Sequence, residues 1–500
     1  MTQRIAKNAI WNFSGQVAQS VVALVCIPLL VKYLGLSRVG LLSLIWVMVG
    51  YFSILDFGLG QALTKTAAEA IAAGDATKVR RLYSNATRIQ LLMGLAGGMM
   101  MAASAGYLVT NVLKVPEPLQ AEAQLSVILC AVAFPLVLLA SSATGMLQAA
   151  QRFDIINLVQ VPLGIGQFLL PLICVIWSKN LAIIVAALLA SRIVALICLS
   201  HMARKIVGSN DATIVAPSGE LRSLISFGGW VTISNIVSPL MVFADRFLIG
   251  ALQTVSALTY YSVPSDATLR FLIVPRSLAS AMFPVMSATA DPARLRDLVL
   301  RSVRYILLLV GIPTLLLFFA AHEAMSLWMG ESFAARSSLV LQILLPGILA
   351  NSIAQVPYAL IQATGRADIT AKLHVAEFPL YAAIAFFAIR TWGVEGAAFI
   401  WTLRVMVDTA VLFYVARRRI GISFSDASVH LIPRLLGMLA IGAAASLLLK
   451  SLLDEPTGIW IAMICLAAIL VSMGWGWFLT ESERARMIQI LPDRSARGSV

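Results

Sequence analysis

Long apolar stretches separated by short polar connections run along the whole chain. A helix that crosses about 30 Å of hydrocarbon needs about 20 mostly apolar residues, and we find fourteen such stretches. Alternation with a period of two residues is absent, so the pattern predicts an all-α polytopic membrane protein. The predicted spans are residues 10–32, 39–60, 89–111, 123–147, 155–177, 180–200, 223–249, 261–287, 305–321, 338–363, 373–390, 394–415, 434–450 and 458–479.

The composition agrees with this pattern. The chain of 500 residues is 60% hydrophobic and 12% charged, whereas about 25% of residues are charged in a typical soluble protein. A soluble enzyme, a nucleic-acid factor and a disordered protein are therefore excluded. The net charge of +13 informs membrane topology before it suggests any partner.

The basic residues indicate an orientation. With the N-terminus in the cytoplasm, 25 of the 37 Lys and Arg residues fall in inner segments and 7 in outer segments. Cytoplasmic segments carry the excess of basic residues in membrane proteins. Both termini are therefore predicted to be cytoplasmic.

The sequence contains an internal repeat. Residues 147–155 resemble residues 361–369 at an offset of 214, and three further places match at offsets between 212 and 216. Each repeat holds six spans, which makes the halves parallel copies related by an axis along the membrane normal. We therefore predict an N-lobe (1–210, spans 1–6), a C-lobe (211–420, spans 7–12) around a central cleft, and an appended segment (421–500, spans 13–14 and a cytoplasmic tail). The alternative is a duplication that built only a large helical bundle.

Ten ionisable residues lie inside the predicted spans. A charge at the centre of a bilayer costs several kcal/mol, so these side chains should face a wet cavity or one another. They are therefore the first functional candidates. They are Asp56, Arg192, Asp245, Arg246, Asp266, Arg270, Arg276, Glu377, Arg404 and Asp408.

Two pairs among them have helical spacing. Asp266 and Arg270 are four residues apart, as are Arg404 and Asp408. This spacing places both charges of each pair on one helical face. A purely structural role for these two pairs is as well supported as a functional one.

The remaining charges differ in their surroundings. Asp245 and Arg246 lie near the outer end of span seven. The simpler explanation for charges at this position is that their side chains reach the membrane–water interface. Arg192, Arg276 and Glu377 have no partner on their own helix, so they carry the most information about a cleft.

These residue types suit phosphate binding and proton transfer. A guanidinium is a planar fork of donors that matches phosphate, and Arg192 and Arg404 come from equivalent spans of the two lobes. A desolvated carboxylate has a raised pKa and can bind and release a proton, which makes Asp56, Glu377 and Asp408 candidates for proton coupling. A neighbouring arginine opposes this rise in pKa, because it favours the ionised carboxylate.

Several aromatic side chains offer surfaces on which sugars can stack. The alternative is an interfacial aromatic belt, which is the more common arrangement. The residues are Trp11, Trp46, Tyr260, Tyr261, Tyr358 and Tyr381.

No motif for catalysis, metal or cofactor binding is present. His322-Glu323 does not begin an HExxH motif, and there is no glycine-rich phosphate loop. We expect no cofactor, no metal and no enzymatic activity. A membrane glycosyltransferase or polymerase stays open as an alternative, although such enzymes usually carry substantial outer loops.

Several segments resemble one family. They are residues 145–154 (GMLQAAQRFD), 227–231 (FGGWV) leading to 245–250 (DRFLIG), and 11–13 (WNF) with 33–35 (YLG). The chain resembles bacterial O-antigen and exopolysaccharide flippases (Wzx-type) of the multidrug/oligosaccharidyl-lipid/polysaccharide (MOP) exporter superfamily. The resemblance covers about residues 1–420, and the family commonly has a two-span tail.

The resemblance implies transfer of an undecaprenyl-diphosphate-linked oligosaccharide from the cytoplasmic to the periplasmic leaflet of the bacterial inner membrane. It also implies a MATE-like fold, a lipid-linked glycan and the bilayer as partners, other polysaccharide-assembly membrane proteins as further partners, and no nucleic acid. On this basis the residues divide into headgroup contacts (Arg192, Arg270, Arg276, Arg404), coupling candidates (Asp56, Glu377, Asp408) and structural or gating charges (Asp245, Arg246, Asp266).

Two relatives of the same superfamily remain alternatives. Peptidoglycan-precursor flippases carry arginines in their first helix, whereas nothing charged lies between Lys7 and Lys32. Cation-coupled multidrug exporters place a key acidic residue in the first lobe, often in that helix. The only such residue available in this chain is Asp56, which lies in the second predicted span. A scaffold for polysaccharide assembly is the alternative without transport.

Overall fold

The computed structural model describes residues 2–52, 56, 58–207, 241, 243–289, 291–420 and 456–477, with scattered residues at 434–448, 481 and 484. Every secondary-structure element in this part of the chain is helical, as the hydrophobic pattern predicts. The predicted span 223–249 lies largely outside the described residues, and the predicted span 434–450 is described only in part.

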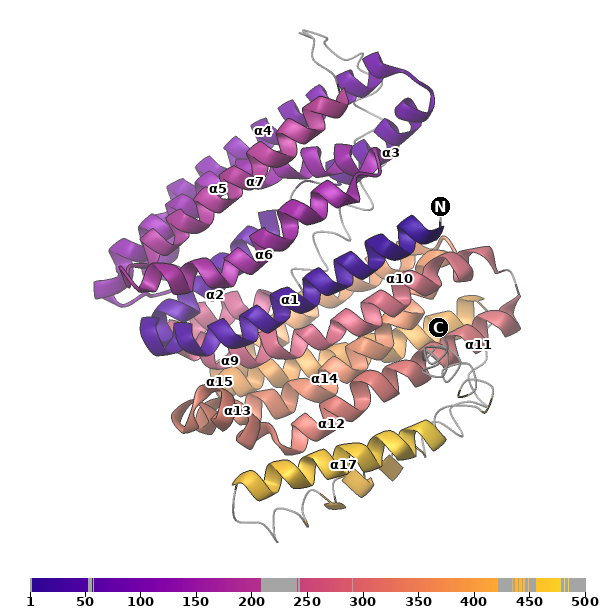
Figure 1. Cartoon of the computed structure of the whole chain (residues 1–500). Coiled ribbons are helices and arrows are strands. Elements are labelled where there is room, and N and C mark those ends of the chain that lie inside the picture. The colour runs from indigo at the N-terminus through magenta and orange to yellow at the C-terminus, as the bar shows by residue number, and fades with distance from the viewer. Residues whose placement is uncertain are drawn as a thin grey trace, which may run out of the picture. The chain divides into compact units, whose positions relative to one another are not determined.

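Within each continuously described stretch, the helices follow one another with short connections (Figure 1). Two π-helical turns (η1, η3) and a 3-10 turn (η2) interrupt the α-helical runs. A further helical segment, residues 243–252, precedes α9. The elements are α1 (Thr2–Leu34), α2 (Leu36–Phe52), α3 (Leu59–Ala72), α4 (Ala76–Tyr107), η1 (Leu108–Val112), α5 (Glu117–Ala149), α6 (Phe153–Val175), α7 (Leu181–Val207), α9 (Val255–Leu269), η2 (Arg270–Leu272), α10 (Ile273–Ala288), α11 (Pro292–Ile306), η3 (Leu307–Gly311), α12 (Ile312–Phe319), α13 (Ala321–Met329), α14 (Glu331–Ala363), α15 (Ala367–Ile420) and α17 (Pro456–Trp477).

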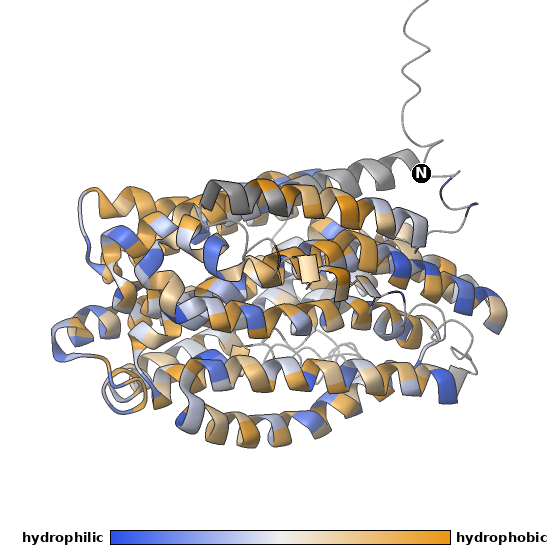
Figure 2. Cartoon of the chain, turned by 90° about the horizontal axis from the view of Figure 1, so that it is seen from below, coloured by the Kyte–Doolittle hydropathy of each residue, from blue (hydrophilic) through white to orange (hydrophobic). Residues whose placement is uncertain are grey.

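Within the described residues, nine helices are long and apolar enough to cross a membrane. Figure 2 shows hydrophobic residues along the middle of most helices and hydrophilic residues gathered towards the helix ends. This distribution is that of a multi-pass membrane protein, because the middle of each span meets lipid and its ends meet water. The total of fourteen spans stays a prediction.

The described contacts divide the chain into two compact units. The first comprises residues 1–263 and 368–400, and the second comprises residues 264–367 and 401–500. The division passes through α9 and α15, because residues 255–259 of α9 pack on the start of α2 in the first unit. The lobes 1–210 and 211–420, the appended segment 421–500 and the cleft rest on the sequence repeat and stay predictions.

Helices α3 to α7 share one hydrophobic core in the first unit. Leu63, Met146 and Leu199 are fully buried members of it. Helices α4 and α5 approach closely, because a Cβ atom on Gly94 would lie only 2.5 Å from the Cα atom of Pro135. Small residues at such contacts allow membrane helices to pack backbone against backbone.

The second predicted span, residues 39–60, is not one continuous helix, so the prediction of an unbroken span was wrong. Helix α2 ends at Phe52, and α3 begins at Leu59. Gly58 adopts a φ of 72° immediately before α3, a conformation that glycine reaches without the strain of a side chain. Apolar composition alone does not show this interruption, which places the N-terminus of α3 inside an apolar region.

The predicted spans 373–390 and 394–415 fall within one assigned helix, α15, that bends sharply. Gly393 has φ 61° and ψ −137°. A Cβ atom on Gly396 would lie 2.3 Å from the carbonyl oxygen of Ala388, although residues eight apart in a straight helix are about 12 Å apart. The chain therefore folds back at Gly393, and the two predicted spans are separate helices.

Helix α14 is central to the second unit, where α10, α11, α12 and α13 pack on it. The last part of α15 is joined to it by hydroxyl groups. Thr402 Oγ1 donates to the Ile343 carbonyl at 2.7 Å, and Thr409 Oγ1 donates to the Ala350 carbonyl at 3.1 Å. Such bonds hold helices together where lipid supplies no hydrophobic driving force.

Candidate functional site

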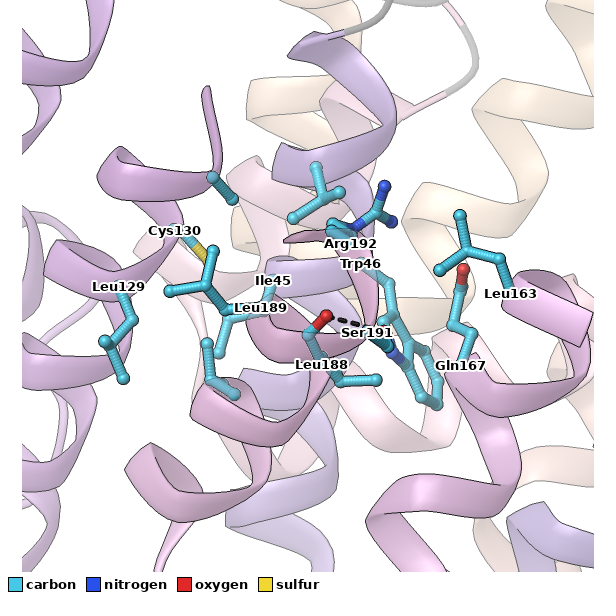
Figure 3. Close-up of a pocket in the computed structure, with 13 residues that line it drawn as sticks. Ile45, Trp46, Leu129, Cys130, Leu163, Gln167, Leu188, Leu189, Ser191 and Arg192 are labelled. Carbon is cyan, nitrogen blue, oxygen red and sulfur yellow. Dashed lines mark hydrogen bonds between the residues drawn. The ribbon is translucent and has the colours of Figure 1, made fainter. Parts of the chain in front are cut away.

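A pocket opens among α2, α5, α6 and α7 of the first unit (Figure 3). Its empty volume is about 420 Å³, including the open mouth, and most of its lining side chains are Leu, Ile, Val or Ala. The other side chains that line it are Trp46, Cys130, Gln167, Ser191 and Arg192. Pockets with apolar walls and a few convergent polar groups are the usual form of a ligand site.

Arg192 brings a positive charge into this pocket from the middle of α7. The side chain is half-buried, and within the described part of the chain its guanidinium has no hydrogen bond or ion pair. Figure 3 shows it on the same side of the pocket as Trp46 and Gln167. An uncompensated guanidinium among apolar walls favours an anionic ligand, and the predicted headgroup contact of Arg192 stays a prediction.

Asp56 caps the start of α3 in the interruption between α2 and α3. Its side chain is 8% exposed, and it accepts hydrogen bonds from the backbone N–H groups of Gly58 at 2.8 Å and Gly60 at 3.3 Å. The hydroxyl of Ser141 on α5 donates to the same carboxylate at 2.7 Å. A carboxylate satisfies the free N–H groups at a helix N-terminus and interacts favourably with the helix dipole. Asp56 thus has a structural role whether or not it carries a proton.

Replacing Asp56 by Ala should lower the free energy of unfolding by about 2 kcal/mol, the upper end for loss of a helix cap. Asp56→Asn should lose less, because the amide oxygen still accepts a hydrogen bond. Denaturation of the purified protein in detergent measures both. The matched control is Asp75→Ala, since Asp75 caps α4 through the Lys78 N–H at 2.8 Å in an exposed position. Equal losses for Asp56→Ala and Asp75→Ala would contradict the buried cap.

A buried ion pair joins α2 and α5 and was not singled out from the sequence. Arg38 Nε donates to Glu122 Oε1 at 2.6 Å. The other carboxylate oxygen, Oε2, accepts from the backbone N–H of Leu181 at 3.4 Å, at the first residue of α7. Glu122 therefore connects the ends of three helices. Both charges lie just outside predicted spans, where basic and acidic residues are common, so no pattern in the sequence indicates this pair.

Asp245 and Arg246 are buried inside the protein, at 1% and 2% exposure, so the explanation that they extend to the membrane interface was wrong. The Asp245 carboxylate accepts the phenolic hydrogen bond of Tyr261 and the backbone N–H of Arg246. The guanidinium of Arg246 lies 5.2 Å from the ring centroid of Phe243. These contacts hold both charges within the protein, and their structural or gating role stays a prediction.

The remaining predicted site residues are distant in sequence from the residues that line the pocket. In the second unit, Arg270 lies within electrostatic reach of Asp266, and Asp408 within reach of Arg404, as their spacing predicts. Arg276 on α10 is exposed. In the first unit, Glu377 on α15 is half-buried. Among the described residues, no three His, Cys, Asp or Glu side chains are grouped to hold a metal ion.

Residues 5–290 match a protein family described as polysaccharide biosynthesis protein. The matched region is more than half of the chain and includes all four helices of the Arg192 pocket. The chain belongs to the polysaccharide biosynthesis protein family. In this family member, Arg192, Asp56, Glu122 and Asp245 all lie within the matched residues.

One relative and two solved structures extend this assignment. A Shigella flexneri protein named "Putative O-antigen transporter" is 28% identical over 415 residues, which are 83% of this chain and 98% of that protein. An inward-facing multidrug resistance MATE family transporter of the MOP superfamily has a TM-score of 0.70 at 15% identity, covering 83% of this chain and 98% of the other. Lipid II flippase MurJ, in an inward closed conformation, has a TM-score of 0.70 at 12% identity, covering 92% and 97%.

The family match confirms the predicted assignment to proteins of polysaccharide biosynthesis. At identities below 25%, the two solved structures establish the fold alone, which is that of MATE transporters and MurJ. The relatives are transporters and flippases and not enzymes. The protein is accordingly a multi-pass membrane protein of the polysaccharide biosynthesis protein family.

Proposed function

We propose that this protein moves an undecaprenyl-diphosphate-linked oligosaccharide from the cytoplasmic to the periplasmic leaflet by alternating access, for O-antigen or exopolysaccharide synthesis. Sugars and diphosphate cannot cross hydrocarbon without polar partners. A passage lined by guanidinium groups can carry the head while the lipid tail stays in the bilayer. The observation that carries the proposal is Arg192, a half-buried guanidinium that has no ion pair among the described residues and lies in an otherwise largely apolar pocket.

The remaining headgroup contacts in this proposal are Arg270, Arg276 and Arg404. A diphosphate offers several anionic oxygens, and each bidentate contact with a guanidinium contributes both charge and geometry. Arg404 is the repeat equivalent of Arg192, at an offset of 212 residues. The two arginines would then contact the head from corresponding helices of the two repeats.

The proposed location is the bacterial inner membrane, with both termini in the cytoplasm. The excess of basic residues in the predicted inner segments supports this orientation. A flippase in that membrane receives its glycan from enzymes of the cytoplasmic leaflet and delivers it to enzymes of the periplasmic leaflet. Membrane proteins of polysaccharide assembly are therefore the proposed partners.

The proposed coupling is to protons, with Asp56, Glu377 and Asp408 as candidate carriers. Asp408 is half-buried beside Arg404, so substrate binding at the arginine would change the electrostatic environment of the carboxylate. Asp408→Asn should remove the response of transport to an imposed pH gradient. Asp56→Asn should remove this response only if Asp56, besides capping α3, also exchanges a proton.

Replacing both Arg192 and Arg404 by Ala should reduce leaflet transfer at least tenfold. A hydrogen bond to a charged group contributes about 1.5–3 kcal/mol, so the loss of two such contacts exceeds a factor of ten. The measurement is transfer of undecaprenyl-diphosphate-linked glycan by purified protein in proteoliposomes. The control is Arg390→Ala, which removes an exposed guanidinium located 5.6 Å from the ring centroid of Phe386.

Normal transfer by the double variant at equal protein amount would contradict the role of these arginines. Transfer of the peptidoglycan lipid precursor, or of cationic drugs, in place of the glycan would favour the two alternatives within the superfamily. A chemically altered glycan recovered after incubation would favour a membrane glycosyltransferase.

A further inference from the structure

The Arg192 pocket contains an aromatic ring and an amide that a phosphate contact does not require. Trp46 from α2 and Gln167 from α6 line it together with Arg192 from α7 (Figure 3). The indole of Trp46 packs edge-to-face on Phe168, with ring centroids 5.0 Å apart and an interplanar angle of 64°. This contact fixes the ring in the pocket wall.

Hydrogen-bonding groups in this wall lack protein partners. The Nε1–H group of Trp46 is buried and has no acceptor among the described residues. The Gln167 side chain has no hydrogen bond in the described part of the chain either, whereas the hydroxyl of Ser191 is satisfied by the Leu188 carbonyl at 2.7 Å. A buried tryptophan usually has a partner for its N–H group. The wall therefore presents an indole N–H, an amide and a guanidinium to a ligand rich in oxygen.

A sugar attached to a phosphate has the complementary chemistry. Its ring has apolar C–H faces that suit a flat indole, and its hydroxyl groups can accept from Trp46 and exchange hydrogen bonds with Gln167. The phosphate suits Arg192.

We propose that this pocket is a sugar-phosphate subsite, in which Arg192 binds the phosphate, Trp46 stacks on the first sugar and donates to it, and Gln167 contributes to the choice of sugar. The inference rests on the proposed flippase function, because the first sugar of a lipid-linked glycan is bonded to the diphosphate. It adds a determinant of substrate choice to the charge contacts proposed above.

Calorimetric titration of the purified full-length protein with glucose 1-phosphate, galactose 1-phosphate, N-acetylglucosamine 1-phosphate, glucose and inorganic phosphate tests the subsite. At least one sugar phosphate should bind more tightly than both inorganic phosphate and glucose. Trp46→Phe should weaken that binding about fivefold, because one hydrogen bond is lost while the ring remains. Trp46→Ala should weaken it at least tenfold. Gln167→Leu should change the ratio of affinities for the three sugar phosphates.

The matched control is Trp177→Phe, since Trp177 is 80% exposed beyond the end of α6 and outside the pocket. Its affinities should equal those of the wild type, and all variants should match the wild type in thermal unfolding midpoint and elution volume. Unchanged affinity in folded Trp46→Ala would overturn the proposal. A wild type that binds inorganic phosphate as tightly as every sugar phosphate would also overturn it, leaving Arg192 as an anion contact only.

Leaflet transfer separates this inference from the proposed function. Transfer of the glycan that fails in Arg192→Ala but is unchanged in Trp46→Ala and Gln167→Leu would keep the flippase and remove the sugar subsite. Selective binding of a sugar phosphate by a wild type that transfers no lipid-linked glycan would keep the subsite and remove the flippase.

Discussion

Replacing Arg38 by Ala should lower the free energy of unfolding by about 3 kcal/mol. The Glu122 side chain is 8% exposed, so removal of the guanidinium leaves its carboxylate charged in a site nearly closed to water. Breaking a buried ion pair from one side costs about 3–5 kcal/mol. The lower end applies here, because the backbone N–H of Leu181 still donates to Glu122.

Replacing Glu122 by Ala should lower the free energy of unfolding by less than replacing Arg38 does. Arg38 is 29% exposed, so in Glu122→Ala its guanidinium can reach water. The double variant Arg38→Met with Glu122→Leu should recover much of the loss, because it leaves neither charge buried. Chemical denaturation in detergent measures all three variants. Equal losses in the two single variants would show that the pair contributes through packing and not through desolvated charge.

Replacing Gly40 by Ala should separate α2 from α9. A Cβ atom at this position would lie 1.9 Å from the carbonyl oxygen of Val255, and a backbone atom cannot move aside without its helix. Overpacking costs about 1–3 kcal/mol and occasionally more, and this contact is close enough to reach the upper end. The control is Gly50→Ala on the same helix, where no neighbouring atom lies within 4 Å of the added carbon.

Cross-linking measures this separation directly. The hydroxyl oxygens of Ser37 and Ser256 lie 2.8 Å apart at the same contact. The pair Ser37→Cys with Ser256→Cys should therefore form a disulfide on oxidation, and Gly40→Ala should reduce its yield at least several-fold. Single-cysteine variants control for the native thiols. An undiminished yield in the presence of Gly40→Ala would contradict the close approach of the two helices.

Hydropathy predicts the membrane class and most spans because burial in lipid constrains long stretches of sequence. The pairing of Arg404 with Asp408 and of Asp266 with Arg270 also follows from the sequence, since spacing along one helix determines it. Arg192 was identified for a related reason: a charge inside an apolar span needs a polar environment, and the structure supplies a pocket. These inferences depend only on local pattern.

Features that depend on contacts between helices could not be predicted from one sequence. Glu122 pairs with Arg38, which is 84 residues away in the sequence. Either residue alone resembles an ordinary charge at the end of a span. The interruption before α3 depends on the conformation of Gly58 and on hydrogen bonds to Asp56. Trp46 belonged to a group of aromatic residues with two explanations, and its position in the pocket separates it from the others.

The bend at Gly393 limits where reporters can be inserted to map topology. An epitope or protease site placed there would force apart Ala388 and Gly396, which are held at contact distance. The connection between α6 and α7 is suitable instead, because Trp177 and Lys179 are exposed. An insertion at 177–179 should leave a functional protein whose tag reveals the side of the membrane, whereas one at 393 should yield protein that is degraded before it can be assayed.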